Sequence, residues 1–159
     1  MIGRIKDSND EAIFWIQQAS AYYESSQVLE ESQYENKAIP LITLQAFSVE
    51  CSLKCFLLCC NGTFDREHKL ATLFNNLPQQ VTDDINDKFF NLHELDFKKC
   101  IGEIDNHFVD SRYYFEQLKK TYVGRTFSTG YLEAIAKFLL DYAKQNEIFL
   151  KSFNQNKSK

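Results

Sequence analysis

The chain has 159 residues, the length of one domain, with a net charge of −4 and a pI of about 5.4. Its 14 Phe, 8 Tyr and 44% hydrophobic residues exclude a chain that is disordered throughout, because these side chains need a core. The mild acidity argues against general nucleic-acid binding, in which Lys and Arg neutralise phosphates. With only 5 Gly and 2 Pro, the composition disfavours an all-β fold and predicts long helices.

Neither a membrane span nor an export signal is predicted. No run approaches the roughly 18 consecutive apolar residues of a membrane helix, and the longest strongly apolar run covers only residues 55–60. Residues 1–10 carry charges where a signal peptide has its apolar segment. Four of the 5 cysteines lie within residues 51–60, which is unlike a secreted disulfide scaffold. We therefore expect a cytoplasmic protein without membrane contact.

The first predicted helix runs from Ser8 to about Glu31. Ser8 and Glu11 fit a capping box, in which a hydroxyl and a carboxylate three residues apart satisfy free backbone N–H groups. Apolar residues then recur at helical spacing, at Ala12, Trp15, Ile16, Ala19, Tyr22 and Tyr23.

The second predicted helix is the central one. It follows Pro40, a residue suited to a first helical turn, and runs to Cys60 before Gly62 ends it. Apolar residues occupy two flanks of this helix, and Glu50 and Lys54 share a narrow polar stripe between the flanks. A helix that is apolar on both flanks is packed from both sides.

Four further helical segments follow, and no strand is predicted. They are a short helix that opens near Asp65 and covers Glu67 to Leu77, a turn or two within residues 81–90, a longer helix over about 95–116, and a final helix from Tyr131 to about Phe153. The sequence therefore predicts a single all-α domain over residues 1–159, with residues 154–159 as a frayed tail. Its architecture is an up-and-down bundle of four long helices plus one or two short ones.

The crowded cysteines have two interpretations. Cys51, Cys55 and Cys59 recur every four residues on nearly one helix face, where three thiolates would suit a soft metal. Zinc sites usually take closely spaced ligand pairs, and here there is no CxxC and no His on this face. Because reduced cysteine is commonly a small buried apolar residue, core packing is the favoured interpretation. No metal and no other cofactor is predicted.

The order Glu50 then Lys54, four residues apart, makes a favourable helical ion pair. On an otherwise apolar helix, three interpretations remain open for the pair. It lies on a solvated edge, or it forms a buried structural ion pair, or it belongs to a ligand site. A buried charge is tolerated only when it is matched.

His68 and Arg112 are the other candidate polar residues. His68 opens the predicted third helix, either as a packing or capping residue or as a donor to Glu50 or to a carbonyl. Arg112, followed by Tyr113, lies in an aromatic-rich helical segment, and its planar donors suit a carboxylate or a phosphate. Structurally it would pair with Glu50 or Glu116; functionally it would form an anion site. No catalytic constellation can be assembled from these spacings.

Taken in order, these segments resemble the HEPN (higher eukaryotes and prokaryotes nucleotide-binding) domain family. Residues 45–58 place a Glu and a Lys four apart on a central helix, Gly62 follows, and His68-Lys69-Leu70 opens the next helix. Residues 108–113 look like the family's later Arg-Tyr element. The resemblance implies an α-helical up-and-down bundle that is often dimeric. Members act as nucleotide-binding or interaction modules beside minimal nucleotidyltransferases, or as metal-independent ribonucleases in toxin–antitoxin and phage-defence systems.

One departure from the family bears on activity. Ribonuclease members carry an Arg followed four to six residues later by a His, whereas Arg112 is followed there by Glu116, Gln117 and Leu118. The resemblance therefore implies a non-catalytic, homodimeric module of a toxin–antitoxin or defence system that binds a nucleotide or a nucleotidyltransferase partner. Its site residues are expected to be Glu50, Lys54, His68, Arg112 and Tyr113.

Two alternatives to this expectation are kept. One is a degenerate ribonuclease whose site is completed across a dimer, where His68 meets Arg112. The other is a purely structural dimer whose polar residues form a fixed internal network.

Overall fold

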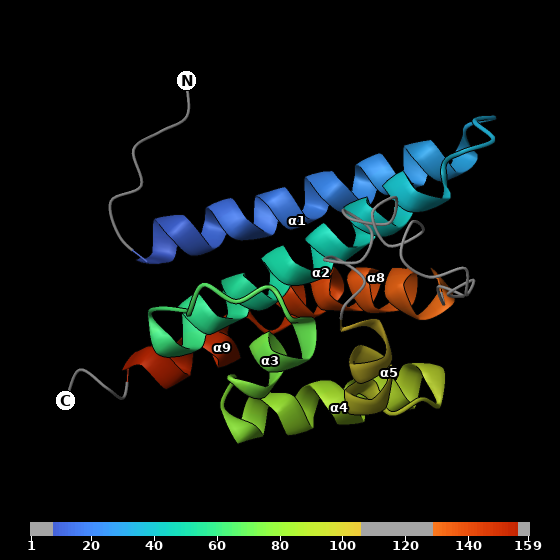
Figure 1. Cartoon of the computed structure of the whole chain (residues 1–159). Helices are drawn as coiled ribbons and strands as arrows, with labels where there is room; N and C mark the ends of the chain where they lie inside the picture. The colour runs from blue at the N-terminus through green and yellow to red at the C-terminus, as the bar shows by residue number, and fades with distance from the viewer. Residues whose placement is uncertain (1–7, 106–128, 156–159) are drawn as a thin grey trace.

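The computed structural model describes residues 8–105 and 129–155, and its regular structure in these two ranges is entirely helical (Figure 1). The helices are α1 (Ser8–Glu31), α2 (Ala38–Asn61), α3 (Leu70–Asn75), α4 (Gln79–His93), α5 (Phe97–Ile104), α8 (Thr129–Gln145) and α9 (Glu147–Gln155). The all-α prediction is confirmed. The long helices among the described residues are α1, α2, α4 and α8.

Helix α2 is the centre of the bundle, as predicted. It contacts α1, α3, α8 and α9, and Figure 1 shows it antiparallel to α1 with α8 on its other side. Most of its residues are buried, from Leu41 to Cys60. By length and mean hydropathy α2 is apolar enough to cross a membrane, but 83% of its most apolar window is covered by the rest of the fold. It is the core helix of a soluble helical domain.

Small residues bring α1 close to α2. Ala12, Ala19 and Ser26 recur every seven residues on α1, and each is almost completely buried. The Ser48 hydroxyl of α2 donates a hydrogen bond of 2.8 Å to the Ala19 carbonyl oxygen, so a polar atom on the apolar helix is satisfied at this contact.

The ends of α2 follow the sequence signals closely. The helix begins at Ala38, two residues before Pro40, and it ends at Asn61. Gly62 then takes the left-handed conformation, with φ of 74°, and its N–H donates to the Leu58 carbonyl oxygen at 2.9 Å. A residue without Cβ adopts this conformation at little cost.

The third helix is shorter than predicted, and His68 does not open it. Helix α3 covers only Leu70–Asn75. The Glu67 carboxylate accepts hydrogen bonds from the backbone N–H groups of His68 (2.7 Å) and Lys69 (2.9 Å). These bonds hold residues 67–69 outside the helix, because a side chain that binds nearby N–H groups competes with helical hydrogen bonding.

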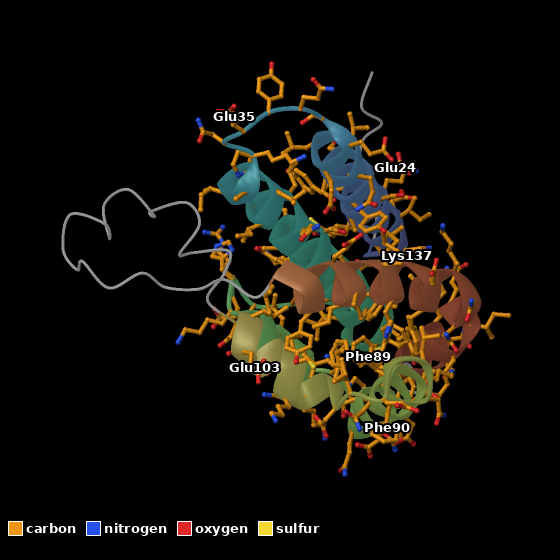
Figure 2. All side chains as sticks on the ribbon, turned by 90° about the vertical axis from the view of Figure 1, so that its right-hand side faces the viewer. Glu24, Glu35, Phe89, Phe90, Glu103 and Lys137 are labelled. Atoms are coloured by element: carbon orange, nitrogen blue, oxygen red, sulfur yellow. The ribbon has the colours of Figure 1, made fainter. Side chains whose placement is uncertain are left out.

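The fourth and fifth helices also differ from the prediction. Helix α4 has 15 residues, where only a turn or two was expected. Its Phe89 packs against Phe138 of α8, with ring centroids 5.1 Å apart, whereas Phe90 is about half exposed. Figure 2 shows Phe89 on the side toward α8 and Phe90 on the outer side. This alternation places α4 on the bundle surface.

Of the predicted helix over about 95–116, the structure describes residues 95–105, in which α5 ends at Ile104; residues 106–116 lie outside the described residues. Asp96 caps its first turn by accepting a 2.8 Å hydrogen bond from the Lys99 N–H. Immediately after Ile104, the Asp105 carboxylate accepts the Ala71 N–H at 2.6 Å and joins the end of α5 to α3.

The predicted final helix is broken at Asn146 into α8 and α9. The Asn146 amide donates to the Tyr142 carbonyl oxygen at 3.0 Å, and its side-chain oxygen accepts from Lys88 at 2.8 Å. After the break α9 packs against α2 and reaches Gln155, so the predicted frayed tail is helical at its first two residues.

Candidate functional site

The structure brings three of the five predicted site residues together. One carboxylate oxygen of Glu50, Oε1, lies 2.5 Å from Lys54 Nζ and 2.9 Å from His68 Nδ1. The side chains of Glu50 and Lys54 are only 5% and 7% exposed, whereas that of His68 is 55% exposed. The solvated-edge interpretation of the Glu50–Lys54 pair is therefore wrong, because the pair is buried.

Local structure explains this meeting. Residues four apart on a helix lie on one face, so α2 places Lys54 beside Glu50. The reversal at Gly62 returns the chain along α2, and the Glu67 carboxylate fixes the backbone at His68. The predicted contact between His68 and Glu50 is confirmed, although it is made from an extended segment.

Two aromatic rings complete the surroundings of Lys54. Its Nζ lies 5.0 Å from the ring centroid of Trp15 and 5.3 Å from that of Phe64, within cation–π range. The two rings meet edge to face at 5.5 Å, and Trp15 Nε1 donates to Glu11 at 3.3 Å. We refer to Glu50, Lys54, His68, Trp15 and Phe64 as the Glu50 cluster.

Trp15 and Phe64 were not predicted as site residues. The available signals were weak: Trp15 is the single Trp of the chain, and Phe64 is an aromatic residue in the otherwise polar segment after Gly62. Neither signal states which cation the ring approaches.

The second carboxylate oxygen of Glu50 is unsatisfied, as are two other buried oxygens of α2 among the described residues, Gln45 Oε1 and Ser52 Oγ. Oε2 is buried and has no hydrogen-bond partner among the residues that the structure describes. The Lys54 ammonium and the His68 imidazole both contact Oε1 instead. Because a buried carboxylate oxygen without a donor costs free energy, Oε2 marks the place where a further donor would be stabilising.

Arg112 and Tyr113 lie outside the described residues, so the pairing of Arg112 with Glu50 or Glu116 stays a prediction.

The Glu50 carboxylate also orients the His68 ring. A His whose Nδ1–H donates to a carboxylate is fixed in tautomer and in ring direction. Oriented in this way at the surface, the imidazole is suited to contact an anion when protonated, or to exchange a proton with a bound group.

The cysteines pack in the core. All five are buried: Cys51 lies with Ala19 and Leu140, and the other four belong to the main apolar cluster. Within residues 8–105 and 129–155, no three His, Cys, Asp or Glu side chains are grouped as a metal site. Burial, reinforced by the Glu50 charge, raises the pKa of Cys51 to about 12, so this thiol stays protonated.

The comparisons with known proteins agree with this arrangement. The sequence model of the HEPN domain matches residues 12–145, a range that begins in α1 and ends with α8. No curated protein and no solved structure gives a significant match. The matched range contains α2, the Glu50–Lys54 pair and the His68 segment in the order given above. Since the match covers most of the sequence, the chain belongs to the HEPN domain family.

Proposed function

We propose that this HEPN domain is a non-catalytic module that binds a nucleotide, or an acidic surface of a protein partner such as a nucleotidyltransferase, at the Glu50 cluster. The observation that carries the proposal is the buried Glu50 carboxylate, which holds an exposed His68 through one oxygen and has no described donor at the other. A purely structural pair would leave neither an exposed imidazole nor an unsatisfied oxygen.

The contacts suggest different roles for the residues. The Lys54 ammonium is enclosed by Glu50 and two aromatic rings, so it neutralises Glu50 and does not reach a ligand. His68 is more than half exposed and is the member of the described set that a ligand meets first. In the proposal Arg112 donates to the phosphate or to a partner carboxylate, and Tyr113 supports Arg112 by stacking.

The net charge of the proposed site favours an anionic ligand. Glu50 and Lys54 cancel, and Arg112 with a protonated His68 would leave the site positive, although the whole chain carries −4. A local positive site on an acidic protein suits one phosphate group better than a long nucleic acid, which requires many basic contacts. Homodimerisation and membership of a toxin–antitoxin or defence system belong to the same proposal.

A thermal-shift panel tests the nucleotide form of the proposal. The panel holds ATP, GTP, AMP, dinucleotides and a short RNA, with wild type beside Arg112→Ala and His68→Ala. A ligand at 100 times its Kd adds about 2.7 kcal/mol, or several degrees at this chain length. We expect a shift that disappears in Arg112→Ala, weakens in His68→Ala and persists in Lys137→Ala, a variant of an exposed lysine on α8.

Absence of a shift with every ligand would contradict the nucleotide form. The melting curves without ligand separate binding from structure, because a fixed internal network predicts a loss of about 3–5 kcal/mol in Arg112→Ala. The binding role predicts a smaller loss.

The Glu50–His68 contact also favours a second candidate, the dimer-composite ribonuclease. A carboxylate that orients an exposed imidazole is the arrangement used in acid–base catalysis. This candidate predicts poor growth on expression and RNA cleavage in the presence of EDTA, both relieved by Arg112→Ala or His68→Ala. Normal growth together with intact RNA would contradict it.

A further inference from the structure

A groove of about 620 Å³ lies between the C-terminal half of α4 and one face of α8. Its α4 wall includes Lys88, Leu92 and His93, and its α8 wall includes Lys137 and Phe138. None of the residues that line it belongs to the Glu50 cluster. Small-molecule sites in proteins have volumes of this order and combine an apolar lining with a few polar groups, so the groove can hold a ligand of that size.

The exposure of Leu92 shows that part of the apolar face of α4 is left uncovered at this groove. Three residues of this face precede Leu92 at helical spacing and are completely buried: Val81, Ile85 and Phe89. Leu92 continues the same face but is 67% exposed. The helix is not frayed at Leu92, because it runs on to His93 and the Glu94 N–H donates to the Phe90 carbonyl oxygen at 2.7 Å. Leu92 is therefore a fixed apolar wall without a cover, which an apolar ligand would supply.

The α8 wall of the groove is aromatic. Phe138 and Tyr142 lie one turn apart on it, and Ala134, one turn before Phe138, is a small residue that leaves space. The two helices meet beside the groove, where the Tyr142 hydroxyl donates a 2.6 Å hydrogen bond to the Asp84 carboxylate. Because aromatic rings prefer stacked or edge-to-face contacts with other rings, this wall favours a flat aromatic ligand.

Each wall of the groove also carries one lysine, Lys88 on α4 and Lys137 on α8. Lys88 pairs with Asp84 at 2.7 Å and Lys137 with Asp141 at 2.8 Å, yet about half of each lysine side chain is exposed. Exposed ion pairs contribute little to stability, so an anionic group of a ligand can take the place of an aspartate at small cost. Asp141 is the one carboxylate among the described lining residues, so the two lysines leave the lining with a net positive charge.

We propose that this groove is a binding site for a small aromatic anion, a flat ring system that carries one carboxylate or sulfonate. The rings lie between Leu92 and Phe138, and the anionic group lies between Lys88 and Lys137. The inference goes beyond the proposed function, because it does not depend on any residue of the Glu50 cluster.

A pair of related dyes tests this inference on the full chain. The probe is 1-anilinonaphthalene-8-sulfonate, and the control is N-phenyl-1-naphthylamine, which has the same rings without the sulfonate. Fluorescence titration gives the Kd and the stoichiometry, and amide chemical shifts of nitrogen-15-labelled protein locate the site. We expect one saturable site with shift changes confined to α4 and α8, and we expect the uncharged control to bind about tenfold more weakly.

Matched variants separate the groove from the rest of the surface. Leu92→Ser should weaken probe binding about fivefold, whereas Phe90→Ser, at an exposed residue on the outer side of α4, should not change it (Figure 2). Lys137→Gln should also weaken binding about fivefold, whereas Lys98→Gln, at an exposed paired lysine outside the groove, should not. His68→Ala should leave probe binding unchanged, so this inference and the proposed function can fail separately.

Three results would overturn the inference. They are probe binding that does not saturate, as on a loosely packed apolar surface, an affinity for the uncharged control at least equal to that for the probe, and equal effects of Leu92→Ser and Phe90→Ser. Leu92, Phe90 and both lysines are exposed, so these variants should fold, and circular dichroism melts confirm this before each titration.

Discussion

Glu50 shares one oxygen between the Lys54 ammonium and the His68 imidazole, while its other oxygen lies buried. The low exposure of Glu50 and Lys54 means that both charges have lost most of their hydration. In such a pair the attraction between the partners offsets their desolvation, but one partner left alone is strongly destabilising.

Removal of the Lys54 charge therefore has a large expected effect. Lys54→Met keeps most of the chain length and leaves Glu50 with His68, and we expect a loss of about 3 kcal/mol in the free energy of unfolding. The matched control is Lys137→Met, which breaks an exposed pair of the same spacing with Asp141 and should cost less than about 1 kcal/mol. Urea denaturation measures both, and equal losses would show that the Glu50 pair is not effectively desolvated.

The double variant Glu50→Gln/Lys54→Met tests whether the loss in Lys54→Met comes from leaving the buried Glu50 charge unpaired. Because the buried charge is removed together with its partner, the double variant should be more stable than Lys54→Met alone. A further loss of stability would contradict this.

At the site, the sequence predicts contacts between residues of the same helix, but it does not predict which residues of other segments contact that helix. The spacing of Glu50 and Lys54 predicts their contact without a structure. The contact of His68 was one option among several, because it depends on the path of the chain after Gly62. The approach of Trp15 and Phe64 to Lys54 depends on how α1 and that segment pack, which no local pattern contains.

Among the helices, the ends with local signals were predicted and those fixed by distant partners were not. Gly62 ends α2 through its own backbone, so the signal lies in the sequence. The break after α8 involves Lys88, 58 residues away from Asn146, and the end of α5 is tied to Ala71, 34 residues away. The apolar periodicity of a helix continues through these two helix ends, so it does not predict where the helices stop.

Substitutions of two glycines, Gly62 at the end of α2 and Gly102 within α5, test the role of the backbone conformation at the end of α2. Gly62→Ala should cost about 1 kcal/mol, because φ is positive, although the added Cβ would lie an ordinary 3.6 Å from Asn154. Gly102→Ala in α5 meets nothing within 4 Å and should stabilise by about 0.5–1 kcal/mol. Thermal denaturation measures both, and the same sign for the two variants would refute the explanation.

Across the whole molecule, buried cysteine thiols and the buried Tyr142 hydroxyl make the stability of the fold depend on pH in the alkaline range. The pKa values of Cys51, Cys55, Cys100 and Tyr142 are raised by burial, by hydrogen bonds, or by both, whereas that of Cys59 is lowered. The folded state thus keeps protons that the unfolded chain releases above about pH 9. When the unfolded state binds fewer protons, stability falls as pH rises.

We therefore expect the Tm to fall between about pH 8 and about pH 10.5, and to fall less steeply in Cys51→Ala, which lacks one of these acids. Circular dichroism melts at matched ionic strength measure both slopes. A Tm that does not change with pH, or an identical slope in the variant, would show that these thiols and the phenol do not govern the alkaline limit.

The position of α2 in the chain has a consequence for its synthesis. Of the helices that cover this apolar helix, α1 is translated before it, whereas α8 and α9 follow more than 60 residues further on. While the ribosome makes the intervening residues, the flank of α2 that α8 and α9 will cover is open to water. During that interval the nascent chain exposes an apolar, aggregation-prone surface, and we expect chaperones to bind there.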